Sequence, residues 1–176
     1  MSKVNLETGD LVIYGKSGVC RVTDIGERTF NRRSRRYYIL KPIDDDRSTI
    51  YAPTDSEQAV GKMRRLLTKD EILQLVSQVP QEPLPWIYNE HQRKEAFQQI
   101  LAEGDRGKLI QMLRTLYLQK KKRTAAGRKL YSSDEQIFRA AEKLLFEEFY
   151  TVLHLKKNQL IPFLFGGKSL TSAEIQ

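Results

Sequence analysis

The sequence predicts an α+β protein in which a small antiparallel β-barrel precedes an all-α helical bundle. Short runs rich in Val, Ile, Tyr and Thr, interrupted by Gly and Asp, occupy the first 66 residues, a texture typical of short paired strands. From residue 68 onward, apolar residues recur at helical spacing instead. Between the two helical stretches that follow, residues 82–91 contain Pro83, Pro85 and Trp86, the single tryptophan.

Five segments are expected to be strands: residues 10–14, 19–25, 37–41, 49–52 and 62–66. The segment between the second and third strands, residues 28–36, carries five arginines: Arg28, Arg32, Arg33, Arg35 and Arg36. This composition fits a solvated hairpin tip and equally fits a loop that contacts anions.

The first long helix is expected to begin after Thr68, because Thr68 and Glu71 have the spacing of a capping box, and to end at Pro80. We expect it to pack on the barrel and to close the N-terminal domain. Residues 1–79 then form the first domain, residues 80–85 a stiff linker and residues 86–176 the helical domain, with the two domains separately foldable.

Pro85 is suited to open the next helix, which ends at Gly104. Asp105 can cap a second helix, and Ser132 or Ser133 starts a third with Asp134 in its first turn, where the helix dipole favours an acid. Residues 159–165 are expected to form a short docking helix, and residues 166–176 to be frayed.

Composition limits the classes of protein that the chain can represent. No apolar run approaches the ~20 residues that span a bilayer, and the first ten residues lack the profile of a signal peptide. We therefore expect a cytoplasmic protein without membrane contact. We also expect it to be a monomer. Cys20 is the single cysteine, which excludes an intramolecular disulfide and favours a small buried residue.

Residues that could carry catalysis are scarce. His91 and His154 are the only histidines, and neither has a carboxylate at the spacing of a metal site. We therefore predict no metal, no cofactor and no catalytic residue, and a binding module is preferred to an enzyme.

The charge favours a polyanionic partner. Thirty Lys and Arg residues face 22 Asp and Glu residues, a net charge of +8. A run of six basic residues without an acid spans positions 120–129: Lys120, Lys121, Lys122, Arg123, Arg128 and Lys129. This run fits a phosphate clamp or a solvated helix end that the dipole favours. Trp86 likewise fits a core residue or an exposed wedge.

Several motifs resemble the CarD/CdnL transcription regulators, whose N-terminal module also occurs in transcription-repair coupling factors. In the first half these motifs are residues 6–14 (LETGDLVIY) followed by Gly18 and Val19, residues 37–41 (YYILK), 50–53 (IYAP) and 60–64 (VGKMR). In the second half they are Trp86 and residues 101–105 (LAEGD), 127–130 (GRKL), 132–135 (SSDE) and 141–145 (AEKLL).

The resemblance implies a Tudor-like N-terminal barrel that lends a strand edge to the β subunit of bacterial RNA polymerase. By position, Ile50, Tyr51 and Ala52 fall on that strand, with Arg28 and Arg64 flanking it. It also implies that the C-terminal helices hold promoter DNA at the upstream edge of the melted region. The function implied is a regulator that stabilises the open complex.

In that role Trp86 wedges into the minor groove. Relatives often carry basic residues directly after this Trp, whereas the chain has Ile87, Tyr88, Asn89 and Glu90. DNA affinity is therefore expected to rest on Arg93, Lys94 and the basic run at 120–129. The alternative function is a free-standing basic nucleic-acid-binding protein that is not tied to polymerase.

Overall fold

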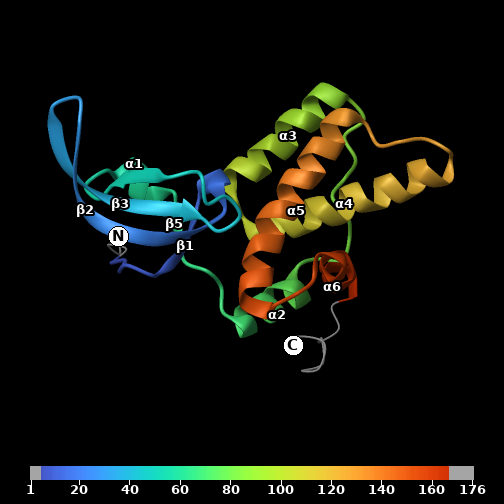
Figure 1. Ribbon diagram of the computed structural model, residues 1–176. Coiled ribbons are helices and arrows are strands. Elements are labelled where there is room, and N and C mark those ends of the chain that lie inside the picture. Colours follow the sequence, from blue (N-terminus) through green and yellow to red (C-terminus); the bar gives the residue numbers. More distant parts are fainter. Residues whose placement is uncertain (1–4, 167–176) are drawn as a thin grey trace. The chain divides into compact units, whose positions relative to one another are not determined.

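The computed structural model describes residues 5–166, and the chain divides into two compact units, one up to Leu66 and one from Leu67 (Figure 1). The first unit contains an antiparallel sheet and the second contains helices. The α+β class is therefore confirmed. Each unit is described by itself below.

The N-terminal unit is a five-stranded antiparallel sheet in the order β4-β3-β2-β1-β5. Its strands are β1 (Leu11–Tyr14), β2 (Val19–Phe30), β3 (Arg33–Pro42), β4 (Ile50–Pro53) and β5 (Met63–Arg64). The short helices η1 (Gly15–Ser17) and α1 (Glu57–Gly61) lie between strands in the sequence. The expected barrel is not closed, because β4 and β5 are the two edges and the two-residue β5 pairs with β1 alone among the described strands.

Strands β2 and β3 form a hairpin that is longer than the sequence predicts. Pairing continues through the arginine-rich segment as far as Phe30 opposite Arg33. Asn31 and Arg32 make the turn with positive φ angles of 51° and 62°, as a two-residue hairpin turn of type I′ requires. Residues 28–36 are therefore a hairpin tip, which projects from the sheet in Figure 1.

One face of the sheet carries the small core of this unit. Its buried residues are Val12, Cys20, Val22, Leu40, Ala52, Ala59 and Met63. Cys20 is fully buried, which confirms the expectation that it acts as a small apolar residue.

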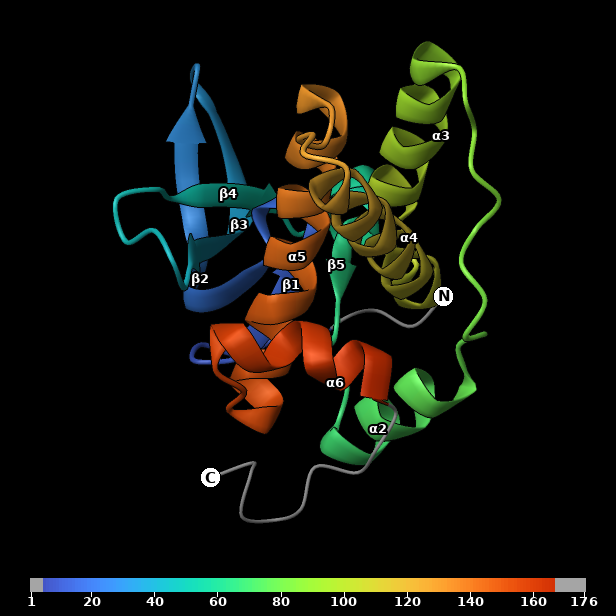
Figure 2. The ribbon, with the colours of Figure 1, turned by 90° about the vertical axis from the view of Figure 1, so that its right-hand side faces the viewer.

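The second unit contains five α-helices among its described residues. These are α2 (Lys69–Gln78), α3 (Glu90–Glu103), α4 (Arg106–Ala125), α5 (Ser132–Leu153) and α6 (Leu160–Gly166), with the short helix η2 (Lys157–Gln159) before α6. Figures 1 and 2 show α2 and α6 side by side. The expected docking helix at residues 159–165 corresponds to α6, whereas residues 167–176 of the segment expected to be frayed lie outside the described part.

Local signals place most helix ends. The capping box of Thr68 and Glu71 is present, and Asp105 accepts a hydrogen bond from the Lys108 amide at 2.9 Å. Gly104 ends α3 with a φ angle of 64°, a left-handed conformation that glycine adopts without strain. The sequence suggests that Pro85 opens this helix, but α3 begins at Glu90, because Asn89 supplies the cap.

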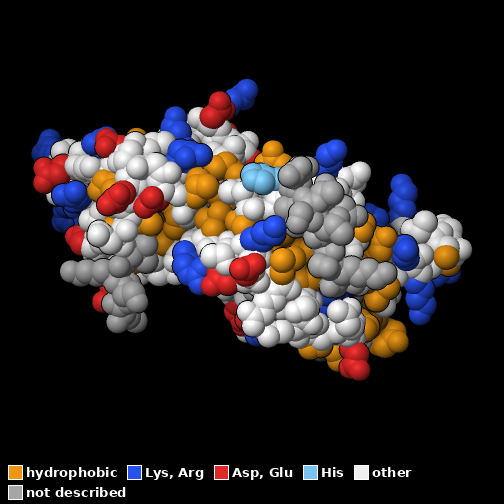
Figure 3. Space-filling model, turned by 90° about the horizontal axis from the view of Figure 1, so that it is seen from below, with side chains coloured by type: hydrophobic (Ala, Val, Ile, Leu, Met, Phe, Trp, Pro, Cys, Tyr) orange, Lys and Arg blue, Asp and Glu red, His pale blue; other side chains and the backbone are white. Residues whose placement is uncertain are grey.

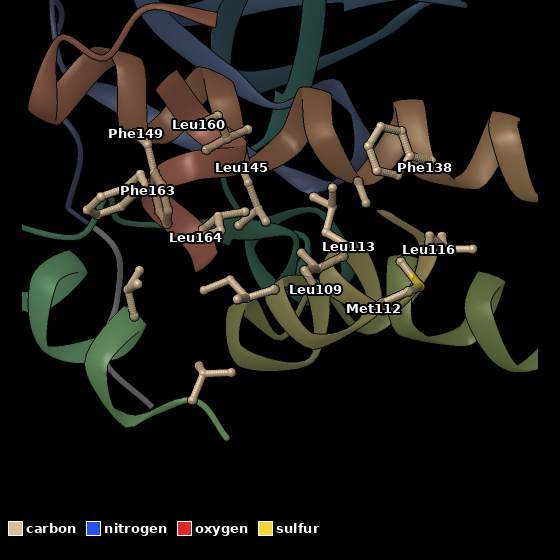
Figure 4. Close-up of a cluster of buried hydrophobic side chains, with 14 of the residues drawn as sticks. Leu109, Met112, Leu113, Leu116, Phe138, Leu145, Phe149, Leu160, Phe163 and Leu164 are labelled. Atoms are coloured by element: carbon tan, nitrogen blue, oxygen red, sulfur yellow. The ribbon is translucent and has the colours of Figure 1, made fainter. Parts of the chain in front are cut away.

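The core of the helical unit is built around α4, with side chains from α5 and α6 pointing toward it (Figure 4). Helix α2 adds Ile72, Val76 and Val79 to this core. The expectation that α2 closes the N-terminal domain is therefore wrong, because its apolar face meets α4 and α5. The amide of Leu67, just before α2, also donates to buried Glu148 of α5 at 2.8 Å.

The segment between α2 and α3 is held against α4. Arg114 of α4 is 1% exposed and donates to the carbonyl oxygens of Pro80 at 3.0 Å and Leu164 at 2.8 Å. Burial lowers the pKa of the Arg114 guanidinium. The amide of Leu84 donates to Thr115 Oγ1 at 2.9 Å. These bonds fix the path of the chain as it approaches Trp86.

Candidate nucleic-acid interface

A cavity of about 300 Å³ opens where α4 ends and α5 begins. Three aromatic rings line it, those of Trp86, Tyr88 and Tyr131. The other lining residues are four basic side chains and two neutral ones: Arg93, Lys122, Arg123, Arg128, Gln119 and Ala126. No carboxylate is found among the lining residues within 5–166, so this part of the cavity combines stacking surface with positive charge.

Helix α4 positions one wall of the cavity. Gln119, Lys122, Arg123 and Ala126 follow the i, i+3, i+4, i+7 spacing of a single helix face. Lys122 and Arg123 lie in the last turn, where the helix dipole favours cations. Lys122 and Arg123 therefore lie at the helix end that the dipole favours and also line the cavity.

Trp86 occupies an intermediate position. It is half-buried and packs against the helical core, with its ring centroid 6.4 Å from that of Phe97. The guanidinium of Arg93 lies 4.4 Å from the Trp86 ring centroid, a distance typical of a cation–π contact. Trp86 therefore contributes both to the core and to the cavity wall.

Arg93 is buried, with 1% of its surface exposed. Its Nε and Nη2 donate to the two carboxylate oxygens of Asp134 at 2.9 and 2.7 Å. Its Nη1 donates to the carbonyl oxygens of Ile87 at 2.8 Å and Tyr88 at 3.5 Å. The expected contact of Arg93 with phosphate is not favoured by this geometry; the side chain instead holds Trp86 and the backbone that follows it.

Cations and rings alternate along the cavity wall. Arg93 lies 5.5 Å from the ring centroid of Tyr131, and Arg123 lies 4.2 Å from the same centroid. The Nε of Arg123 also donates to the carbonyl oxygen of Lys129 at 2.7 Å. These contacts link the start of α3 to the connection between α4 and α5, through the stacked series Trp86, Arg93, Tyr131 and Arg123.

The structure brings five of the nine predicted DNA-binding residues to this cavity: Trp86, Arg93, Lys122, Arg123 and Arg128. The other four, Lys94, Lys120, Lys121 and Lys129, lie outside its lining. Lys120 pairs with Glu135 at 3.2 Å, and Lys121 lies 5.2 Å from the Tyr117 ring centroid. Figure 3 shows several Lys and Arg side chains gathered at the end of the helical unit where the α4–α5 connection lies in Figure 1.

The predicted polymerase-binding residues lie on three strands. Ile50, Tyr51 and Ala52 are on β4, an edge of the sheet, and of these only Tyr51 is exposed. Arg28 is on β2, where it pairs with Asp24 at 2.8 Å. Arg64 is on β5, the opposite edge in the strand order, so it does not flank β4 within the sheet.

Sequence reasoning missed an aromatic cluster beside β4. Phe30, Tyr37 and Tyr51 make three edge-to-face contacts, with ring centroids 5.1–6.2 Å apart. Phe30 is 44% exposed and Tyr51 is 43% exposed. The three aromatic residues are visible in the sequence, but they come from three strands and meet only when the sheet forms.

Two residues of the helical unit were also missed as site residues. Asp134 is fully buried against Arg93, although its place in the first turn of α5 suggested only a dipole contact. Tyr88 is 90% exposed and lines the cavity. The sequence places Asp134 at a helix start without indicating its partner, and no motif identified in the sequence includes Tyr88.

Residues 5–166 contain neither a cluster of metal ligands nor a membrane-spanning helix. No group of three or more His, Cys, Asp or Glu side chains in this range is placed to hold a metal ion. None of the helices described is both long enough and apolar enough to cross a membrane.

Comparison with known families identifies the N-terminal unit. Residues 6–67 match the CarD-like/TRCF RID domain, which confirms the CarD-like resemblance over the unit that contains the sheet. No curated protein matches the chain.

Proposed function

We propose that this protein is a transcription regulator that binds the β subunit of bacterial RNA polymerase through β4 and promoter DNA through its helical unit, and so stabilises the open complex. The coarser part of this function, a transcription-related role with polymerase binding, follows from the CarD-like/TRCF RID domain at residues 6–67. That match is the observation that carries the proposal.

The polymerase contact is proposed for the open edge of the sheet. Strand β4 pairs only with β3 among the described strands, so its outer backbone groups are available for an added strand. Tyr51 exposes its ring on this edge beside Phe30, and exposed aromatic residues are frequent anchors of interfaces. Arg28 and Arg64 are peripheral contacts in this proposal.

The DNA contact is proposed for the cavity and the basic run around it. The described lining residues are rings, cations and two neutral residues, with no carboxylate among them, and this combination favours nucleic acid. Trp86 supplies the apolar group that enters the minor groove at the edge of the bubble, while Lys122 and Arg128 hold phosphates. The role is non-catalytic and needs no cofactor, and the protein works as a monomer in the cytoplasm at the nucleoid.

The test is capture of the full-length chain by the purified lobe of the polymerase β subunit. Wild-type protein binds at micromolar concentration, and Tyr51→Glu weakens binding about tenfold or more, as expected for a central aromatic residue of an interface. Tyr150→Glu is the matched control, because Tyr150 is a tyrosine of the helical unit with 50% exposure. Absence of wild-type binding, with DNA binding retained, would favour the alternative of a free-standing nucleic-acid-binding protein.

A further inference from the structure

Tyr88 is the most exposed large apolar side chain among the described residues, at 90%. It lies in the lining of the cavity that opens where α4 ends and α5 begins, two residues after Trp86. Cations lie against the other two rings of the lining: Arg93 lies near Trp86, and Arg123 lies near Tyr131. Among residues 5–166, no cation and no second ring packs against Tyr88, so its ring has free stacking surface.

The backbone beneath this exposed ring is fixed. The carbonyl oxygens of Ile87 and Tyr88 both accept hydrogen bonds from Arg93, which is itself held by Asp134. Asn89 then caps α3 through the amide of Gln92 at 3.0 Å. Because the backbone at Tyr88 is already ordered, a ligand that stacks on the ring loses little free energy to ordering this segment.

We propose that Tyr88 is a stacking platform for one unstacked base of single-stranded DNA, and that the cavity holds this nucleotide. The proposal rests on the proposed function, since melted promoter DNA supplies the single strand. A base within a duplex offers only its edges, whereas the free face of Tyr88 requires a base whose own face is exposed. Such stacking is tolerant of sequence, because every base has a π face.

The cations of the cavity complete the nucleotide site. Lys122 and Arg128 are exposed in the lining, and Arg123 is held by the Lys129 carbonyl. They give the strand backbone its phosphate contacts on the wall formed by the end of α4. The volume of about 300 Å³ suits one nucleotide, and the lack of a carboxylate among the described lining residues suits its negative charge.

The experiment measures the affinity of full-length protein for a labelled thymidine oligonucleotide of about 12 nucleotides, within the ~4–16-nucleotide sites of single-strand binders. A duplex that contains the same strand, and an RNA strand of matched sequence, are measured alongside. Tyr88→Ala is expected to weaken single-strand binding on the order of five- to a hundred-fold without changing the salt slope. Tyr88→Phe keeps the affinity, and duplex binding is the same in all three proteins.

The inference is overturned by a Tyr88→Ala protein that binds the single strand like wild type, or that loses single strand and duplex equally. Tighter wild-type binding to the RNA strand overturns the assignment to DNA. Lys122→Ala separates this result from the proposed function. If Lys122→Ala weakens duplex binding while Tyr88→Ala changes nothing, the DNA contact stands and the stacking platform falls; if wild type binds no DNA, both fall.

Discussion

The guanidinium of Arg93 and the carboxylate of Asp134 form a buried two-hydrogen-bond ion pair, in which each side chain is 1% exposed. The two residues lie on α3 and α5 and are 41 positions apart. Through Arg93 the pair also reaches the ring of Trp86 and the carbonyl oxygens of residues 87 and 88. It therefore supports the segment that carries both aromatic residues of the candidate interface.

The first prediction concerns the stability that depends on this pair. Asp134→Ala leaves a buried guanidinium without its counter-charge, so the free energy of unfolding is expected to fall by about 3–5 kcal/mol. Urea denaturation measures the change. Glu135→Gln is the control, because Glu135 makes more exposed pairs with Lys120 and Arg139, each worth about 0–1 kcal/mol.

A double variant separates two effects of the Arg93–Asp134 pair, its contribution to the free energy of unfolding and its positioning of Tyr88. Arg93→Met with Asp134→Leu replaces both charges by apolar groups and is expected to recover much of the stability that Asp134→Ala loses. Single-strand DNA binding is expected to be weaker in the double variant than in wild type, because the carbonyl oxygens of residues 87 and 88 lose their donor. Recovery of DNA binding together with stability would show that Arg93 does not position Tyr88.

Local features of the fold could be predicted from the sequence. The capping box of Thr68 and Glu71 depends on residues three positions apart, and Asp105 caps α4 through the amide three residues on. The strands of the sheet follow from short β-branched runs, although the β2–β3 hairpin is longer because arginine side chains do not prevent pairing. The apolar residues of α4 and α5 were also visible as helical stripes.

Contacts between distant residues could not be predicted. An apolar stripe shows that α2 buries one face but does not name its partner, so proximity in sequence favoured the sheet over α4 and α5. The partner of Arg93 lies 41 positions away, and composition does not distinguish a buried arginine from an exposed one. The same limit applies to Tyr88, whose place in the cavity depends on how the segment before α3 meets the end of α4.

The second prediction concerns where the chain can be divided. A fragment of residues 67–176 is expected to fold alone, whereas residues 86–176 are not. The shorter fragment loses Ile72, Val76 and Val79 from the core, at roughly 1.5–3 kcal/mol for each large apolar side chain. It also loses the Pro80 carbonyl that accepts from buried Arg114. Cooperative thermal unfolding of residues 86–176, matching that of residues 67–176, would instead place the boundary at residues 80–85.

The third prediction separates the lysines of the basic run by their surroundings. Lys121 and Lys122 are exposed, so replacing both by Ala is expected to weaken binding to all duplexes alike and to lower the salt slope by about one unit for each lost phosphate contact. Lys120→Ala is the control, because Lys120 is paired with Glu135 and lies against the Phe138 ring. Its effect on the slope is expected to be smaller. Equal slopes for all variants would mean that the run is a solvated helix end.

The last prediction concerns Trp86, which carries no charge and therefore should not affect the salt slope. Trp86→Ala is expected to shorten the lifetime of open promoter complexes on polymerase by about five- to a hundred-fold, from a stacking contribution of roughly 1–3 kcal/mol. The measurement is open-complex dissociation with the variant bound at saturation. Because Trp86 also packs against the helical core, the effect of lost packing has to be separated from the effect of the lost wedge.

Leu84→Ala supplies that separation. Leu84 is half-buried, packs against the same core and precedes Trp86 by two residues, but it does not line the cavity. Both variants are expected to lose stability through lost apolar contacts, and only Trp86→Ala is expected to shorten the open-complex lifetime. Equal lifetimes for the two variants and wild type, with both variants folded, would assign Trp86 to the core alone.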